Sequence, residues 1–502
     1  MRFVLLSVVL TLCAPAADRV RGPLVVSDRW PQSTDLGSWT RDVMRLEGLE
    51  QATETAQGKA FFRWLRLFSR MATGGMIQAY EGEPGAEKYV TDAHKTLFVY
   101  GWGYCDTSSR IAEAAWSEFK RDRALAQRVV VQHANGGYHT MYRLRLDGRW
   151  GAFDPRYGYY LVERDAPDAQ VLDWPQVGDD ARILANRTYR HRSAPFFEFF
   201  GLEWERALLI EPAYHESEDA WTRAGKPIEH VFGNGQYKLG TKYHDMDFEL
   251  VPGTVVTRFW DNTARKFYVP KGKHTQREEP FLASGRFYRV TETMLNGNWP
   301  KHDPNHRWAK PYLATVPANE GYNRDVAGGR TIGQAWGKYE IRTRIPDSGV
   351  FDFASPFVLV DGTLRMGQFE HRTMRAKPSR ADEPDHWSEW KPAARGELAV
   401  HGSYRFQLRG KPGAAVDLHL HFENGLMTLP QIFAGRNRVR VELRNSPQLP
   451  VKITYRWDSE GGERTHQKQL KPSDFRDGKA AYEIDAPGLV RCRSVQVRYG
   501  AD

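Results

Sequence analysis

The stretch from Cys105 to Pro155 constrains the fold more than any other part of this 502-residue sequence. It begins with apolar residues at helical spacing and ends with two segments that alternate between apolar and polar side chains, as strands do. Asp147-Gly148 stands between those two segments, and this dipeptide is typical of the two-residue turn that closes a β-hairpin. The sequence therefore predicts a helix followed by an antiparallel hairpin.

The predicted helix begins at Cys105, and the polar run 106–109 suits its N-terminal cap. Charged residues such as Arg110 and Glu113 fall largely off the apolar side of this helix. The apolar residues recur at helical spacing and predict one buried stripe, made of Ile111, Ala112, Ala115, Trp116 and Phe119.

A cysteine at the start of a helix can act as a nucleophile. The unpaired backbone N–H groups and the helix dipole favour a thiolate there, and a nearby imidazolium lowers the thiol pKa further below its ordinary value of about 8.5. The same N–H groups could hold the oxyanion that forms when a thiolate attacks a carbonyl. The alternative is that Cys105 is a small buried apolar residue, as most free cysteines are.

His139 and Asp154 lie on the two strands of the predicted hairpin. If the turn pairs Leu146 with Arg149, Met141 stands opposite Asp154, so that His139 and Asp154 share a face as diagonal neighbours. Such neighbours are about 7–8 Å apart at the backbone, close enough for the carboxylate to accept a hydrogen bond from the imidazole. The carboxylate would then orient the ring as a base for the cysteine.

Two alternatives stand beside this interpretation. A histidine and an aspartate on a hairpin are commonly solvated polar residues, and a one-residue slip of register would put them on opposite faces. His133 is a rival base, but it precedes a flexible Asn135-Gly136-Gly137 turn and has no carboxylate at matching register.

These residues resemble the transglutaminase-like superfamily. The resemblance covers residues 60–160 and is carried by Gly103-Tyr104-Cys105 and by the run from His139 through Asp147-Gly148-Arg149-Trp150 to Asp154-Pro155. It implies a papain-like core with N-terminal helices, in which Cys105 is the nucleophile, His139 the general base and Asp154 its orienting carboxylate.

The sequence departs from the family pattern at Met141, where the family often has an aromatic residue, and at Asp106, where many members have Trp, Val or Arg. No Asp-rich calcium loop is present, and no cofactor is predicted. His419 and His421 alternate along a strand pattern and could in principle ligate a metal, but no third ligand is evident from spacing, so no metal site is predicted.

The N-terminus predicts export. Arg2, the apolar run 3–12 and the small residues 14–17 indicate a signal peptide over residues 1–17, and the apolar run is too short to span a bilayer. Leu12 is too large to precede a lipidated Cys13, so we expect a secreted or periplasmic protein without a lipid anchor. No later part of the sequence approaches a transmembrane segment.

Removal of that leader leaves Cys105 and Cys492 as the only cysteines, so no disulfide framework is predicted. Cys492 lies in a strand pattern and is expected to be structural, with both thiols free. The formal net charge of +9 is spread along the chain and permits weak attraction to anionic cell-wall or extracellular polymers. No basic cluster is interleaved with aromatic residues, so nucleic acid is not an expected partner.

Composition changes along the chain divide it further. Residues 25–37 have an irregular pattern, and Phe61, Trp64 and Leu65 then mark one face of a helix. Short alternating segments beyond residue 236 predict β-sandwich modules, at 248–260, 337–345, 357–360, 438–443, 451–457 and 494–499. We expect an α+β chain with a catalytic domain at 18–235, a β-rich domain at 236–395 and a C-terminal β-sandwich at 396–502.

The expected activity is that of an exported cysteine-nucleophile acyl-transfer enzyme. It would act through a thioester on amide bonds of peptides or proteins, as a protease or amidase, or as a transglutaminase, since nothing in the residues separates water from an amine as second substrate. The alternative is a non-catalytic extracellular protein that binds a polymer or glycan and uses the transglutaminase-like core as a scaffold.

Overall fold

The structure is a computed structural model of the chain. It describes residues 18–68, 70–71, 92–100, 102–103, 105–132, 138–155, 159–160, 162–163, 168–173, 225–227, 239, 246, 248–259, 266–269, 286–289, 336–375, 387–400, 403–423, 431–444 and 449–500. The signal peptide predicted over residues 1–17 and the rival base His133 lie outside the described residues.

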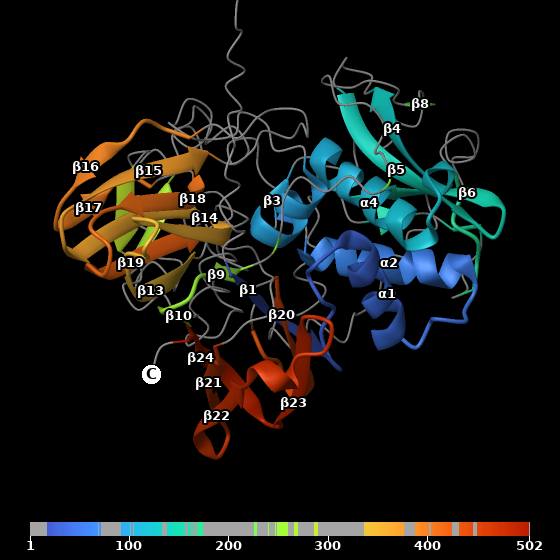
Figure 1. Cartoon of the computed structure of the whole chain (residues 1–502). Helices are drawn as coiled ribbons and strands as arrows, with labels where there is room; N and C mark the ends of the chain where they lie inside the picture. The colour runs from blue at the N-terminus through green and yellow to red at the C-terminus, as the bar shows by residue number, and fades with distance from the viewer. Residues whose placement is uncertain are drawn as a thin grey trace, which may run out of the picture.

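The chain is α+β, as predicted. N-terminal helices pack against a small antiparallel sheet, and antiparallel sheets with a sandwich-like arrangement follow (Figure 1). The described helical segments are α1 (Leu36–Leu46), α2 (Glu54–Phe68), the π-helical turn η1 (Lys95–Tyr100), α4 (Cys105–Lys120) and the 3₁₀ turns η2 (Arg123–Leu125) and η4 (Pro472–Asp474).

The small sheet has the strand order β7-β6-β5-β4-β8 within the described residues, and all of its pairs are antiparallel. Its strands are β4 (Ala126–Gln132), β5 (Tyr138–Leu146), β6 (Arg149–Asp154), β7 (Tyr159–Tyr160) and β8 (Gly225–Pro227). Two further short pairs are β2 (Arg70–Met71) with β3 (Trp102–Gly103), and β11 (Lys266–Val269) with β12 (Arg286–Arg289).

The other described strands belong to one continuous 15-stranded antiparallel sheet, whose central path is β22-β21-β24-β10-β13-β19-β14-β9-β1-β20-β23. Its members are β1 (Val20–Ser27), β9 (Glu249–Leu250), β10 (Thr254–Phe259), β13 (Trp336–Arg344), β14 (Val350–Met366), β15 (Phe369–Arg375), β16 (Lys391–Ala393), β17 (Gly396–Leu398), β18 (Ser403–Arg409), β19 (Ala415–Glu423), β20 (Gly435–Leu443), β21 (Val451–Ser459), β22 (Gly462–Leu470), β23 (Lys479–Ala486) and β24 (Leu489–Tyr499).

The first described strand corrects the prediction of an irregular segment at 25–37. Residues up to Ser27 belong to β1, which pairs with β20 and β9 and so ties the start of the chain to strands more than 200 residues away. Leu36 and Gly37 already belong to α1, whose N-cap Asp35 accepts a hydrogen bond from the Ser38 N–H at 2.7 Å. The sequence pattern hid β1 because its pairing partners are distant.

The strand expected at 357–360 was also predicted too short. Asp361-Gly362 does not turn the chain, since β14 continues to Met366 with a register shift between Leu359 and Asp361. A Cβ atom at Gly362 would come within 2.9 Å of the Leu420 side chain, so this glycine allows close packing of neighbouring strands.

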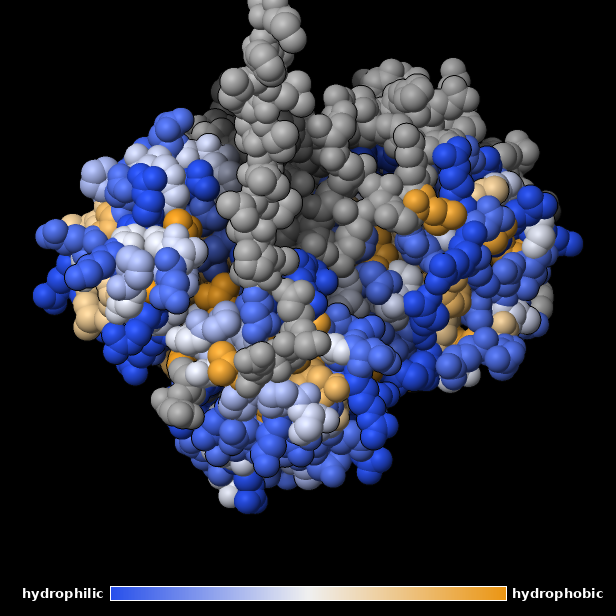
Figure 2. All heavy atoms as spheres, in the orientation of Figure 1, coloured by the Kyte–Doolittle hydropathy of each residue, from blue (hydrophilic) through white to orange (hydrophobic). Residues whose placement is uncertain are grey.

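One face of the molecule is mostly polar. Figure 2 shows that hydrophilic side chains dominate this face, with apolar residues scattered among them. None of the described helices combines the length and the apolar character that a membrane span requires.

Candidate functional site

Helix α4 begins at Cys105, as the sequence predicts. The predicted apolar stripe is buried except at Phe119, which is half-buried. It packs against the other two long helices, since the Trp116 ring lies 5.4 Å from the Phe61 ring of α2 and the Thr40 hydroxyl of α1 lies 3.4 Å from the Ala115 carbonyl. The stripe residues Ile111, Ala112, Ala115 and Trp116 are all fully buried.

The polar side of α4 is buried as well, which the sequence did not predict. Asp106, Arg110 and Glu113 expose only 2%, 9% and 5% of their surface. They pack against the small sheet, where Arg128 of β4 is 1% exposed. Helix α4 is therefore enclosed on both sides, by helices along its apolar stripe and by the sheet along its charged side.

Arg128 holds this charged side in place. Its Nη1 donates to Asp106 at 3.0 Å and its Nε donates to Glu113 at 2.7 Å, while Arg110 lies 3.5 Å from Asp106. Burial raises the pKa of Glu113, although the positive charge of Arg128 opposes that shift. Because Asp106 directly follows Cys105, the ion pair with Arg128 fixes the first turn of the helix against the sheet.

A second contact joins α4 to β5, the strand that carries His139. The Ser109 hydroxyl donates to the Thr140 carbonyl at 3.3 Å. Cys105 precedes Ser109 by four residues, which is about 6 Å along the axis on the same side of the helix. Thr140 follows His139 in β5, so the backbone at His139 lies one residue from the point where α4 contacts the strand.

The hairpin has the predicted turn and register. Leu146 pairs with Arg149, and the ladder continues to Tyr142 opposite Phe153. Asp147 and Gly148 have φ angles of 50° and 81°, both in the left-handed region that a type I′ turn requires.

The turn also caps a helix, which the sequence analysis missed. The Asp147 carboxylate accepts hydrogen bonds from the Glu54 and Thr55 backbone N–H groups, each at 3.0 Å, and from the Thr55 hydroxyl at 2.7 Å. These are the first residues of α2, so the hairpin turn and this helix fix each other's position.

The backbones at two of the three predicted catalytic positions lie at one end of the small sheet. His139 is the second residue of β5, and Asp154 is the last residue of β6, which runs antiparallel to it. Cys105 begins the helix that contacts β5 at that end. The side chains of Cys105, His139 and Asp154 lie outside what the structure describes.

The described register sets a condition on the triad. Arg128 pairs with Tyr142 and reaches α4, so Tyr142 also faces the helix, whereas Met141 and Arg143 point to the opposite face. Strict alternation would put the side chains at 139 and 154 on that opposite face. A triad can therefore form only if the Cys105 sulfur lies at the end of the sheet. It cannot form if the sulfur lies over the face that α4 covers.

Cys492 has the predicted structural role. Cys492 carries a free thiol, is 5% exposed, and donates to the Ile432 carbonyl at 3.0 Å. No disulfide therefore joins it to Cys105.

His419 and His421 share a face of β19, in register with Glu340 and Lys338 of β13. The His419 Nε2 atom lies 3.8 Å from carboxylate oxygens of both Glu340 and Asp417. Across the described ranges, no group of three or more His, Cys, Asp or Glu side chains is arranged to hold a metal ion.

Comparison with known proteins does not place the chain in a family. No family model matches it and no curated protein is similar to it. Solved structures with weak similarity include a cupin 2 conserved barrel domain protein from Leptotrichia buccalis, with 5% identity over 34% of this chain and 86% of that one and a TM-score of 0.13. An allantoicase is 11% identical over 32% of this chain and 72% of its own, with a TM-score of 0.10. The pilus backbone of Streptococcus pneumoniae is 11% identical over 32% of this chain and 71% of its own, with a TM-score of 0.11. Similarity this weak carries no argument about fold or function.

Proposed function

We propose that the chain is an exported cysteine acyl-transfer enzyme that acts on amide bonds of peptides or proteins, with a papain-like, transglutaminase-like core. The observation that carries the proposal is the contact between Ser109 and Thr140, which brings the helix that starts at Cys105 beside the strand that carries His139. Strand β6 ends at Asp154, at the same end of the sheet as His139, and this supports Asp154 as the orienting carboxylate.

In the proposed reaction, the Cys105 thiolate attacks the amide carbonyl carbon, and backbone N–H groups at the start of α4 stabilise the oxyanion. The C–N bond then breaks, and the leaving amine takes its proton from the imidazolium of His139. Water or a second amine attacks the thioester and His139 accepts its proton. The C–S bond then breaks, the acyl product leaves, and the thiolate and imidazolium are restored. Asp154 orients the imidazole throughout.

The Arg128 network has a defined part in this proposal. A carboxylate beside a cysteine disfavours the thiolate by like-charge repulsion. The guanidinium at 3.0 Å from Asp106 counters that charge, so the first turn can carry an acidic residue next to the nucleophile. This explains how the departure at Asp106 is compatible with a reactive thiol.

The test is amide hydrolysis by the full chain on a mixture of unfolded protein substrates, with product termini identified by mass spectrometry. A labelled primary amine in the same reaction distinguishes transfer from hydrolysis. Cys105→Ala should abolish both products, and His139→Ala should slow them by about 10²- to 10⁴-fold. Cys492→Ala is the matched control and should retain the wild-type rate.

Equal rates in wild type and Cys105→Ala would refute the proposal. If the wild type forms no product but binds an extracellular polymer, and Cys105→Ala binds it equally well, the non-catalytic binding protein is the better description.

A further inference from the structure

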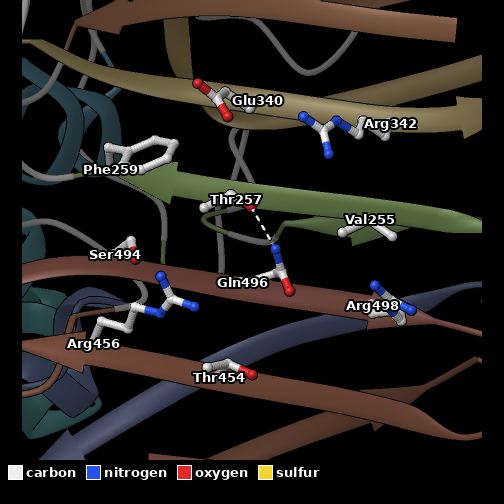
Figure 3. A pocket seen from close by; sticks show the side chains of 10 residues that line it. All are labelled: Val255, Thr257, Phe259, Glu340, Arg342, Thr454, Arg456, Ser494, Gln496 and Arg498. Carbon is white, nitrogen blue, oxygen red and sulfur yellow. Dashed lines mark hydrogen bonds between the residues drawn. The ribbon is translucent and has the colours of Figure 1, made fainter. Parts of the chain in front are cut away.

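A hollow of about 250 Å³ lies on one face of the large sheet, across the neighbouring strands β13, β10, β24 and β21 (Figure 3). We call it the sheet groove. Along each strand, the residues that line the groove alternate with core residues that point to the other face of the sheet. These core residues are no more than 1% exposed, and they are Val256, Ile341, Val497 and Ile453. The groove thus has a rigid, packed base.

The strand register arranges the groove side chains in three rows. Val255 pairs with both Arg342 and Arg498, which places the two guanidinium groups on either side of it. Four residues further along β10, Phe259 pairs with Ser494, and Ser494 pairs with Arg456. Four residues of strand span about 13 Å, so the arginines mark the two ends of the groove.

The groove carries a positive charge. Arg342, Arg456 and Arg498 line it together with a single carboxylate, that of Glu340. The Lys338 ammonium lies 2.6 Å from Glu340 and already balances its charge. Burial works to raise the pKa of Glu340, but Lys338, with smaller contributions from His419 and Arg342, lowers it below its ordinary value. The Arg342 and Arg456 guanidinium groups, at opposite ends of the groove, therefore favour an anionic ligand, and their separation favours one with repeated charges.

The middle row is polar: Thr257 pairs with Gln496 on one side and with Glu340 on the other, so the row ends at the carboxylate that Lys338 balances. The Gln496 amide donates to the Thr257 hydroxyl at 3.0 Å, and the Gln467 amide on β22 donates to the Thr454 hydroxyl at 3.1 Å. Amides and hydroxyls offer both donors and acceptors, which the hydroxyl groups of a sugar require. At one end, Phe259 adds a partly exposed aromatic ring on which the apolar face of a sugar ring can pack.

We propose that the sheet groove binds an acidic polysaccharide whose carboxylates or sulfates bind the arginines and whose hydroxyl groups bind the Thr257 and Gln496 row. A polyanion without hydroxyl groups would leave the central row unused. The site lies on different strands from the proposed cysteine site and does not depend on it.

The groove combines both parts of the predicted β-rich half. Strands β10 and β13 lie within 236–395, whereas β21 and β24 lie within 396–502. A fragment of residues 396–502 would supply Arg456 and Arg498 but not Arg342 or Thr257. The experiment therefore needs the whole chain.

The test is calorimetric titration of the full chain with oligogalacturonate, its fully methyl-esterified form, dextran sulfate and dextran. The proposal predicts saturable binding of at least one of the two acidic probes, and much weaker binding of the uncharged form of the same glycan. Arg342→Gln together with Arg456→Gln should weaken binding by about tenfold or more for each arginine. Both arginines are exposed, and the melting temperature of this variant checks that its fold is intact.

The matched control is Arg436→Gln with Arg438→Gln, which removes the same charge from exposed positions on β20 and should bind as the wild type. Equal losses in the two variants, or no binding of either acidic glycan, would overturn the proposal. Equal affinity for poly-L-glutamate or single-stranded DNA would overturn it as well, because the Thr257 and Gln496 side chains would then contribute nothing. Cys105→Ala should bind as the wild type, which separates this site from the proposed enzymatic activity.

Discussion

The Arg128 Nη1 atom lies 3.0 Å from the carboxylate of Asp106. Asp106 directly follows Cys105, the residue at which helix α4 begins. The same guanidinium reaches Glu113 two turns further along, so a single side chain of β4 fixes the helix to the sheet. The relationship gives the first turn of α4 a fixed position beside β5 and neutralises the acidic residue next to Cys105.

Replacing Arg128 by Gln should destabilise the protein and make the thiol less acidic. Two buried carboxylates would lose their counter-charge, which costs about 3–5 kcal/mol when one partner of a buried pair is removed. The negative charge left beside Cys105 should raise the pKa of its thiol. Urea denaturation and the pH dependence of alkylation by iodoacetamide measure the two effects. Arg145→Gln, at an exposed position of β5, is the control, and equal changes in both variants would contradict this role.

Replacing Asp147 by Ala should destabilise the packing of α2 on the hairpin. The variant loses the cap of α2 and places Ala at a φ of 50°, and loss of such a cap costs about 1–2 kcal/mol. Asp147→Asn keeps a residue that tolerates this φ and should cost less. Thermal unfolding of both variants measures which is the less stable. A larger loss of stability in Asp147→Asn than in Asp147→Ala would show that the cap does not cause the destabilisation.

The same carboxylate gives a pH dependence. Burial works to raise the pKa of Asp147, but the hydrogen bonds from Thr55 and Glu54 outweigh it and lower the pKa below the ordinary 3.8. A carboxyl with a lowered pKa in the folded state stabilises it fully above the unfolded pKa, and this stabilisation is lost as the pH falls through the folded pKa. The stability difference between wild type and Asp147→Ala should therefore shrink below pH 3.8. A difference that persists unchanged there would contradict the assignment.

Asp352 should be important for the attachment of the N-terminal strand. It accepts from Arg19, which precedes β1, at 3.1 Å and from the Arg405 Nε at 2.8 Å. Burial opposes ionisation, yet the two arginines lower the pKa of Asp352. Asp352→Asn should cost about 3 kcal/mol in the free energy of unfolding, whereas Glu370→Gln in the exposed pair with Arg409 should cost less than about 1 kcal/mol. Equal effects of the two substitutions on denaturant midpoints would contradict this difference.

Cys492 should remain unmodified by iodoacetamide in the native protein. Its sulfur is buried and bonded to the Ile432 carbonyl, so alkylation should require unfolding of β24. Peptide mapping before and after addition of guanidinium chloride measures this. Rapid native-state labelling of Cys492 would show that the end of the sheet opens readily.

The sequence predicted the local elements of the candidate site well. The start of α4, the alternation of β5 and the Asp147-Gly148 turn each depend on neighbouring residues, so periodicity and turn chemistry were sufficient. The buried charges could not be assigned in the same way. Asp106 and Glu113 are seven residues apart on one helix face, and Arg128 interrupts the apolar run of β4, but only the packing of helix on sheet joins them.

Long-range pairing explains most other differences. Strand β1 was missed because its partners β9 and β20 lie far along the chain, and β14 was cut short because Asp361-Gly362 has turn composition at a place where the glycine serves packing. The domain boundaries stay predictions, because strands on both sides of the predicted boundary at residue 395 belong to the same sheet. The triad assignment stays a prediction as well, because the side chains of its three residues lie outside the described part of the chain.

The most direct test of the proposed activation of Cys105 is its alkylation rate as a function of pH, in the wild type and in His139→Ala and Asp154→Asn. We expect the wild-type thiol to titrate well below the ordinary value of about 8.5, and both variants to shift the titration upward. A wild-type thiol that titrates near 8.5, or one whose titration is the same after removal of the imidazole, would contradict the account.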